Sequence, residues 1–220
     1  MRKLFLIMAL LLPLAAPAQK VIHYGRFAQA NQALPEANGP RIVLFGDSIT
    51  EGWPEQRPRF FTETGFLGRG IGGEETANFL LRFRSDVLDI GATTVVILGG
   101  INDIAENMGN PYNEEITFGH LKSMAELAQA HGVRVILCSV LPSTHICWNE
   151  VTDVAGKVAR LNARIRSYCY QTGITYLDYY SAMTGPDGCS VREGITTDTV
   201  HPNAEGYAIM EKLLLETLAQ

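Results

Sequence analysis

Five short apolar runs, each bounded by glycine or polar residues, divide the chain after residue 40. Runs of this kind are typical of strands that are buried on both faces. Longer segments between them repeat apolar residues every three or four positions, which predicts amphipathic helices. The predicted strands lie within residues 41–46, 65–73, 93–98, 133–140 and 174–178. The predicted helices are 75–88, 116–130, 151–170 and 204–218, with a proline-containing short helix and loop at 52–61.

Strands that alternate with helices favour parallel pairing through right-handed crossovers. We therefore expect an α/β protein, a three-layer αβα sandwich around a five-stranded parallel sheet. The alternation does not by itself determine the order of the strands.

Chemically useful residues follow several of the predicted strands. Ser48 comes directly after the first apolar run, a glycine-rich turn (70–73) follows the second, and Asn102 follows the third. Near the C-terminus, Asp198 precedes His201 by three residues. Ligands of open α/β sheets bind at the carboxyl ends of the strands. A serine there is a candidate nucleophile if a base, an orienting acid and oxyanion donors accompany it.

These four blocks, in this order, resemble the GDSL/SGNH hydrolase family, whose name gives its Ser, Gly, Asn and His. The resemblance extends from Arg41 to the C-terminus. It implies a flavodoxin-like strand order, 2-1-3-4-5, and a serine esterase that needs no cofactor. The implied catalytic residues are Ser48, Asp198 and His201, and the implied oxyanion hole consists of Ser48, Gly73 and Asn102.

Details of the blocks refine these assignments. Gly73 is preferred to Gly72 because the family's glycine precedes an acidic residue, here Glu74. Glu74 and Glu75 depart from the Asp-Thr that is common in the family at these positions. We interpret Asp47 as a residue that shapes the turn by accepting backbone N–H groups.

Each block also has a simpler interpretation. Asp198 and His201 could belong to the cap of a helix that starts near residue 204. Asn102 could be a turn former after two glycines. Residues 68–73 fit the spacing G-x-G-x-x-G, but the preceding strand is short and the motif lies in the second βα unit, so dinucleotide binding is disfavoured.

The first 18 residues have the three parts of a secretory signal: two basic residues, an apolar stretch and a small-residue cleavage site ending at Ala18. The apolar stretch is shorter than the ~20 residues that span a bilayer, which disfavours the alternative of a membrane anchor. The predicted cleavage point has no cysteine, so nothing there supports a lipoprotein. We expect residues 19–220 to form one periplasmic or secreted hydrolase domain.

The net charge and the cysteine content limit which partners, disulfides and metal sites are expected. The net charge is −5 for the full chain, and it becomes −7 once Arg2 and Lys3 are removed, which argues against a nucleic-acid partner. Export permits disulfides, and the sequence leaves undecided whether Cys147 and Cys189 form one. Cys138 and Cys169 are expected to be buried thiols. No cluster has zinc-ligand spacing, so we predict no metal.

The expected function is hydrolysis of short-chain acyl esters through an acyl-enzyme on Ser48, with carbohydrate-linked O-acetyl esters as the first candidate substrates. A lysophospholipase, thioesterase or arylesterase is the alternative within the family, and a catalytically silent glycan-binding module is the alternative outside enzymes. No stable membrane insertion is expected. Trp53, the loop 106–114 and the stretch 145–148 are candidate walls of the substrate cleft.

Overall fold

The computed structural model describes residues 23–220, so the predicted signal peptide, residues 1–18, lies outside the described residues. Five parallel strands form a central sheet in the order β2-β1-β3-β4-β5. The strands are β1 (Ile42–Gly46), β2 (Leu67–Gly70), β3 (Thr94–Leu98), β4 (Arg134–Cys138) and β5 (Thr175–Leu177). The predicted α/β fold and the implied strand order are both confirmed.

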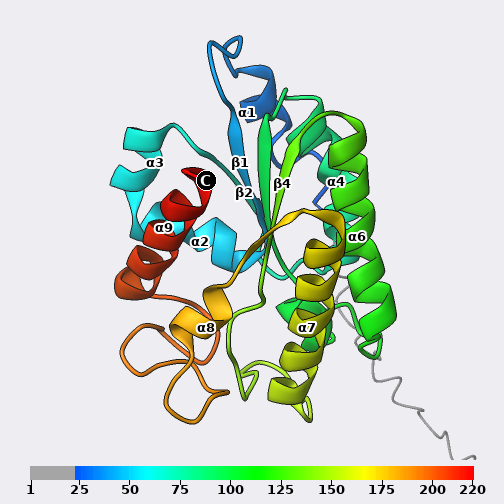
Figure 1. Ribbon diagram of the computed structural model, residues 1–220, viewed down its shortest axis with the longest axis vertical. Helices are drawn as coiled ribbons and strands as arrows, with labels where there is room; N and C mark the ends of the chain where they lie inside the picture. The colour runs from blue at the N-terminus through cyan, green and yellow to red at the C-terminus, as the bar shows by residue number, and fades with distance from the viewer. Residues whose placement is uncertain (1–22) are drawn as a thin grey trace, which may run out of the picture.

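Helices cover both faces of this sheet (Figure 1). One layer contains α4 (Thr76–Phe83), α6 (Glu114–Ala130) and α7 (Val154–Thr172), and the other contains α2 (Ser48–Gln56), α3 (Pro58–Thr64) and α9 (Ala204–Leu218). Short helices complete the chain: α1 (Ala28–Gln32), the π-helix η1 (Arg84–Leu88), α5 (Ile101–Ile104) and α8 (Tyr179–Met183). All five residues of β3 are buried, because helices shield the central strand on both faces.

The structure differs from the sequence-based expectation just after β1. Ser48 is the first residue of α2, which continues through Pro54 to Gln56, whereas a turn at Ser48 and a short helix and loop at 52–61 were expected. The Asp47 carboxylate accepts the Ile49 N–H at 2.9 Å and so caps the helix, as our interpretation of Asp47 proposed. The close junction of strand and helix places Ser48 in the first turn of α2.

The loops after β4 and β5 lie at the same end of the molecule, at the bottom of Figure 1. The loop after β5 folds back on itself, with a bridge between Thr196 and Pro202 and a hydrogen bond from the Thr197 N–H to the His201 carbonyl (2.8 Å). This local pairing holds His201 at the carboxyl edge of the sheet. Between residues 23 and 220, no helix is both long and apolar enough to cross a bilayer.

Candidate active site

Ser48 lies where β1, β2 and α2 approach one another closely. A Cβ atom on Gly70, the last residue of β2, would overlap the backbone of Thr50 and Glu51 in the first turn of α2. Only glycine allows this approach. The glycine-rich turn that follows is fixed to the same helix, because the Gly72 N–H donates to the Glu51 carboxylate at 2.7 Å.

Ser48, His201 and Asp198 form a hydrogen-bonded chain. The Ser48 hydroxyl is 2.9 Å from His201 Nε2, and His201 Nδ1 is 2.8 Å from Asp198 Oδ2. An ionised carboxylate only accepts hydrogen bonds, so Nδ1 must be protonated in the neutral ring. Nε2 is then the acceptor, and the serine hydroxyl donates to it.

The Asp198 carboxylate is held by the backbone of its own loop. Its Oδ1 accepts the N–H groups of Val200 and His201, both at 2.7 Å. Partial burial alone would raise the pKa of Asp198, but the hydrogen bonds from His201 and Val200 outweigh burial and lower the pKa below its usual value. Asp198 therefore stays ionised and fixes the orientation of the ring.

Gly73 and Asn102 lie together at the same edge of the sheet. Gly73 has φ +77°, a left-handed conformation that favours glycine, and the Asn102 amide donates to the Glu74 carbonyl at 3.0 Å. That bond uses one of two amide hydrogens and leaves the other available. The Ser48 N–H is in the first helical turn, where N–H groups have no acceptor within the helix. The arrangement can supply hydrogen-bond donors to an anion.

Asn107 and Trp148 also belong to the site, although no motif identified them. The Trp148 indole is tilted 39° against the His201 ring, with 5.6 Å between centroids, and its Nε1 donates to Asn107 Oδ1 at 2.8 Å. Both residues lie in stretches predicted as cleft walls. A loop asparagine or tryptophan has no periodic pattern, so the sequence offered no signal that would single them out.

The prediction that Trp53 is a wall of the substrate cleft was wrong. Trp53 is 2% exposed and stacks on Phe60 and Tyr207, with ring centroids 5.9 and 5.4 Å apart. Its indole Nε1 donates to Glu211 at 3.2 Å. Burial of the large apolar ring between α2, α3 and α9 explains its position, and Trp53 is a core residue.

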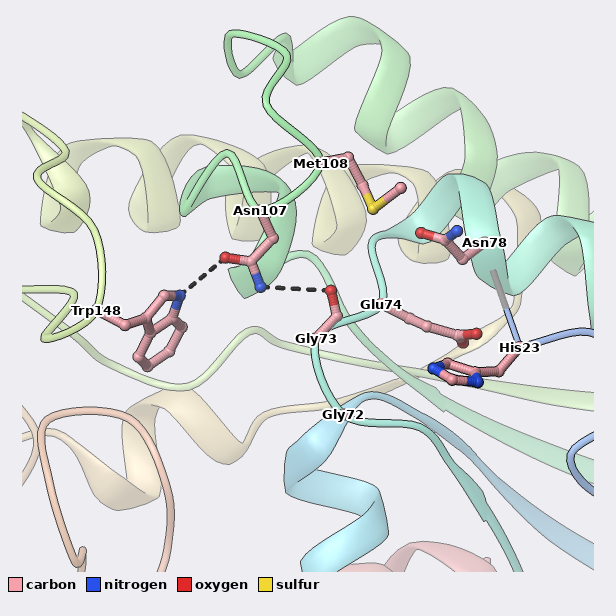
Figure 2. A pocket seen from close by; sticks show the side chains of 8 residues that line it. All are labelled: His23, Gly72, Gly73, Glu74, Asn78, Asn107, Met108 and Trp148. Atoms are coloured by element: carbon pink, nitrogen blue, oxygen red, sulfur yellow. Dashed lines mark hydrogen bonds between the residues drawn. The ribbon is translucent and has the colours of Figure 1, made fainter. Parts of the chain in front are cut away.

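A cavity of about 340 Å³ opens beside the glycine-rich turn (Figure 2). We call it the Trp148–His23 cavity, after the residues at its two ends. Figure 2 shows Trp148 and Asn107 on one side of Gly73, and Glu74, Asn78 and His23 on the other. The lining combines polar and apolar groups, and it consists of His23, Gly72, Gly73, Glu74, Asn78, Asn107, Met108 and Trp148.

Asp47 is fully buried beside Ser48, and one of its carboxylate oxygens, Oδ2, has no hydrogen-bond partner. Burial raises the pKa of Asp47 to about 7, although the Ile49 N–H and the nearby His201 oppose the shift. Between the ordinary aspartate pKa of 3.8 and a pH of about 7, the folded protein holds a proton that the unfolded chain has released. Folding stability due to this group therefore falls as pH rises through that window.

Replacing Asp47 by asparagine should abolish this pH dependence, because the neutral amide still offers an oxygen to Ile49 but cannot ionise. We expect the Tm of the variant minus that of the wild type to increase between pH 5 and pH 8. Each pKa unit corresponds to about 1.4 kcal/mol, and about 1 kcal/mol shifts Tm by 2–4 °C in a protein of this size. Thermal unfolding at the two pH values measures it, and an unchanged difference would contradict the protonation of buried Asp47.

The four cysteines are free thiols in the structure, with Cys138 and Cys169 buried as expected. Cys147 is exposed and Cys189 is partly buried, and the bridge left open by the sequence is not formed. Within residues 23–220, no group of three or more His, Cys, Asp or Glu side chains is arranged to hold a metal ion.

Comparisons with known proteins identify the family of this chain. The sequence profile of the GDSL-like lipase/acylhydrolase family matches residues 44–209. The human isoamyl acetate-hydrolyzing esterase 1 homolog is 32% identical over 170 residues, which cover 66% of this chain and 68% of that protein.

Solved structures resemble it over nearly the whole chain. A GDSL-like lipase from Bacteroides thetaiotaomicron has a TM-score of 0.87 and 43% identity, covering 90% of this chain and 98% of that one. A Bacteroides fragilis protein has the same TM-score, 0.87, at 42% identity, covering 91% and 97%. The chain belongs to the GDSL-like lipase/acylhydrolase family. It is a carboxylic ester hydrolase.

Proposed function

We propose that this protein is an exported serine esterase that hydrolyses short-chain acyl esters, with O-acetyl esters of carbohydrates as its preferred class. The observation that supports the mechanism most directly is the hydrogen-bonded chain from Ser48 through His201 to Asp198. It has the geometry required of a nucleophile, a general base and an orienting acid.

In the proposed first half-reaction, Ser48 Oγ attacks the ester carbonyl while its proton passes to His201 Nε2. The negative charge that develops on the carbonyl oxygen is stabilised by the N–H groups of Ser48 and Gly73 and the Asn102 amide. Asp198 stabilises the imidazolium. The tetrahedral intermediate collapses, the proton on Nε2 passes to the departing alkoxide, and an acyl-enzyme on Ser48 remains.

In the second half-reaction, water attacks the acyl carbonyl and gives its proton to His201 Nε2. The same donors stabilise the second oxyanion. Collapse breaks the bond between the acyl carbon and Ser48 Oγ, and the proton on Nε2 returns to the serine. The products are a carboxylic acid and the free enzyme.

The Trp148–His23 cavity supports the substrate class. At about 340 Å³ it lies near the lower end of typical ligand pockets, which are about 300–1,000 Å³. Its small volume suits a short acyl group better than a long alkyl chain, and the His23 and Asn78 side chains in its lining offer hydrogen bonds to the hydroxyls of an alcohol. The name of the human relative describes hydrolysis of an acetate ester, which is consistent with a short acyl group.

A series of p-nitrophenyl esters tests the substrate class. We expect kcat/KM to be highest for acetate and to fall through butyrate to octanoate, and acetate should be released from acetylated glycans. A fluorophosphonate probe should label Ser48 alone, as mass spectrometry of the labelled peptide would show. A preference for octanoate or lysophospholipids would favour the lysophospholipase alternative. Glycan binding without turnover would favour the silent binding module.

Export rests on the sequence of residues 1–18. Cleavage after Ala18 would leave residues 19–220 as one mature hydrolase domain in the periplasm or outside the cell. N-terminal sequencing of protein recovered from the periplasmic fraction or the medium tests this proposal, and an intact Met1 there would contradict it.

A further inference from the structure

We infer that Asn107 is a positioning residue for ester hydrolysis: its amide holds the two oxyanion donors from separate segments in register and connects them to the tryptophan beside His201. The inference rests on the proposed function of Ser48. It concerns a residue that no block of the GDSL-like sequence pattern contains.

Three hydrogen bonds define the role. The Asn107 Nδ2 group donates to Asn102 Oδ1 at 2.9 Å and to the Gly73 carbonyl at 3.3 Å. Its Oδ1 accepts from Trp148 Nε1 at 2.8 Å. Figure 2 shows the Asn107 amide between the indole and the Gly73 carbonyl. One side chain thus connects the turn after β2, the segment after β3 and the loop after β4.

These partners allow only one orientation of the Asn107 amide. Rotating it by 180° would place its oxygen against Asn102 Oδ1 and the Gly73 carbonyl, and its NH₂ group against the Trp148 N–H. Every polar atom of the side chain is paired, and the residue is 9% exposed. The backbone of Asn107 is fixed as well, since its N–H donates to the Asn102 carbonyl at 3.1 Å.

The consequence for Asn102 is a fixed amide. With Oδ1 occupied by Asn107 and one Nδ2 hydrogen directed at the Glu74 carbonyl, the second hydrogen is the only free donor of the side chain. The bond to the Gly73 carbonyl restrains the turn that presents the Gly73 N–H. Preorganised donors stabilise the transition state more than the bound ester, so their loss should appear in kcat rather than in KM.

The Trp148 bond extends the same restraint to the base. The indole packs against His201 and is fixed through its N–H to Asn107. Trp148→Phe keeps an aromatic ring beside His201 but removes that N–H. It should therefore lower kcat less than a change at Asn107, because the donors keep their own bonds to the amide.

Two substitutions at Asn107 test the inference. Asn107→Asp keeps the acceptor for Trp148 but puts a carboxylate oxygen against Asn102 Oδ1 and the Gly73 carbonyl, and Asn107→Ala removes all three bonds. We expect kcat for p-nitrophenyl acetate to fall about 10–10²-fold in both, somewhat less than loss of a donor itself. KM should change less than about threefold, since substrate binding in the ground state is largely kept.

Asn162→Asp is the matched control. Asn162 is another buried amide, 7% exposed, which bonds the Val140 N–H and carbonyl at 2.8 and 2.9 Å. The same chemical change there should lower Tm and leave kcat near the wild-type value. An Asn107 variant whose kcat equals that of the wild type, at whatever Tm, would overturn the inference. If the aspartate variant does not fold, the alanine variant decides.

A double-mutant cycle separates positioning from general destabilisation. If Asn107 acts through Asn102, the combined loss in Asn102→Ala/Asn107→Ala should be smaller than the product of the two single losses. Fully multiplicative losses would show that Asn107 acts elsewhere. Failure of the proposed function would give a different result, because Ser48→Ala would then retain turnover. If only the inference fails, Ser48→Ala is inactive and the Asn107 variants keep the wild-type kcat.

Discussion

Ser48→Ala should lower kcat for p-nitrophenyl acetate by about 10⁶-fold, as when the serine nucleophile of a triad is removed. The methyl group cannot form the acyl-enzyme, and no other hydroxyl in the hydrogen-bonded chain replaces Ser48 Oγ. The fold should persist, because Asp47, not Ser48, caps α2. Steady-state kinetics and thermal unfolding of the purified variant measure the two effects.

Ser181→Ala is a suitable control for this experiment. Ser181 is also near a helix start, in α8, and its hydroxyl donates to Asp178 at 2.7 Å. Removing that hydroxyl should leave kcat within about twofold of the wild type, as is usual for changes outside a catalytic unit. Undiminished turnover in Ser48→Ala would rule out the acyl-enzyme mechanism.

Asp198→Asn should lower kcat by about 10⁴-fold, by forcing the wrong tautomer on His201. The N–H groups of Val200 and His201 both point at Oδ1, so the oxygen of the new amide must stay there. Its NH₂ group then faces His201 Nδ1, which can accept that hydrogen only if it is unprotonated. The ring proton moves to Nε2, and the base can no longer accept the proton of Ser48.

Asp187→Asn is the control, because it makes the same substitution in a similar turn that has no histidine ring. Asp187 Oδ1 accepts the N–H groups of Cys189 and Ser190 at 3.1 and 2.9 Å, the same kind of turn without a histidine ring. Its kcat should match that of the wild type. If Asp198→Asn retained full activity at neutral pH, Asp198 would not set the tautomer of His201, and the proposed orienting role would be wrong.

The Asp198–His201 pair was readable from the sequence because its geometry is local. A side chain that accepts N–H groups two and three residues ahead forms a turn that depends little on distant contacts. The same holds for the strands, which follow from runs of buried residues. The helix that begins at Ser48 was missed because its cap, Asp47, precedes no clear amphipathic repeat.

Asn107 and the two tryptophans could not be assigned in this way. Trp53 and Trp148 both lie in stretches that looked like cleft walls, but Trp53 faces α9 in the core and Trp148 packs on His201. Which surface each ring covers depends on how helices and loops far apart in the chain are packed. Asn107 gains its partners only when the turn at Gly73 and the loop at Trp148 come together.

The residues alone were enough to predict the succession of strands and helices, the positions of Ser48 and Asn102 after strand ends, and the pairing of Asp198 with His201. The 2.9 Å distance between Ser48 Oγ and His201 Nε2, which are 153 residues apart, became known only from the folded structure. The two kinds of information differ in the range over which the interactions act. Local hydrogen bonds and side-chain periodicity act over a few residues, whereas a contact between two loops depends on the packing of the whole sheet and its two helical layers.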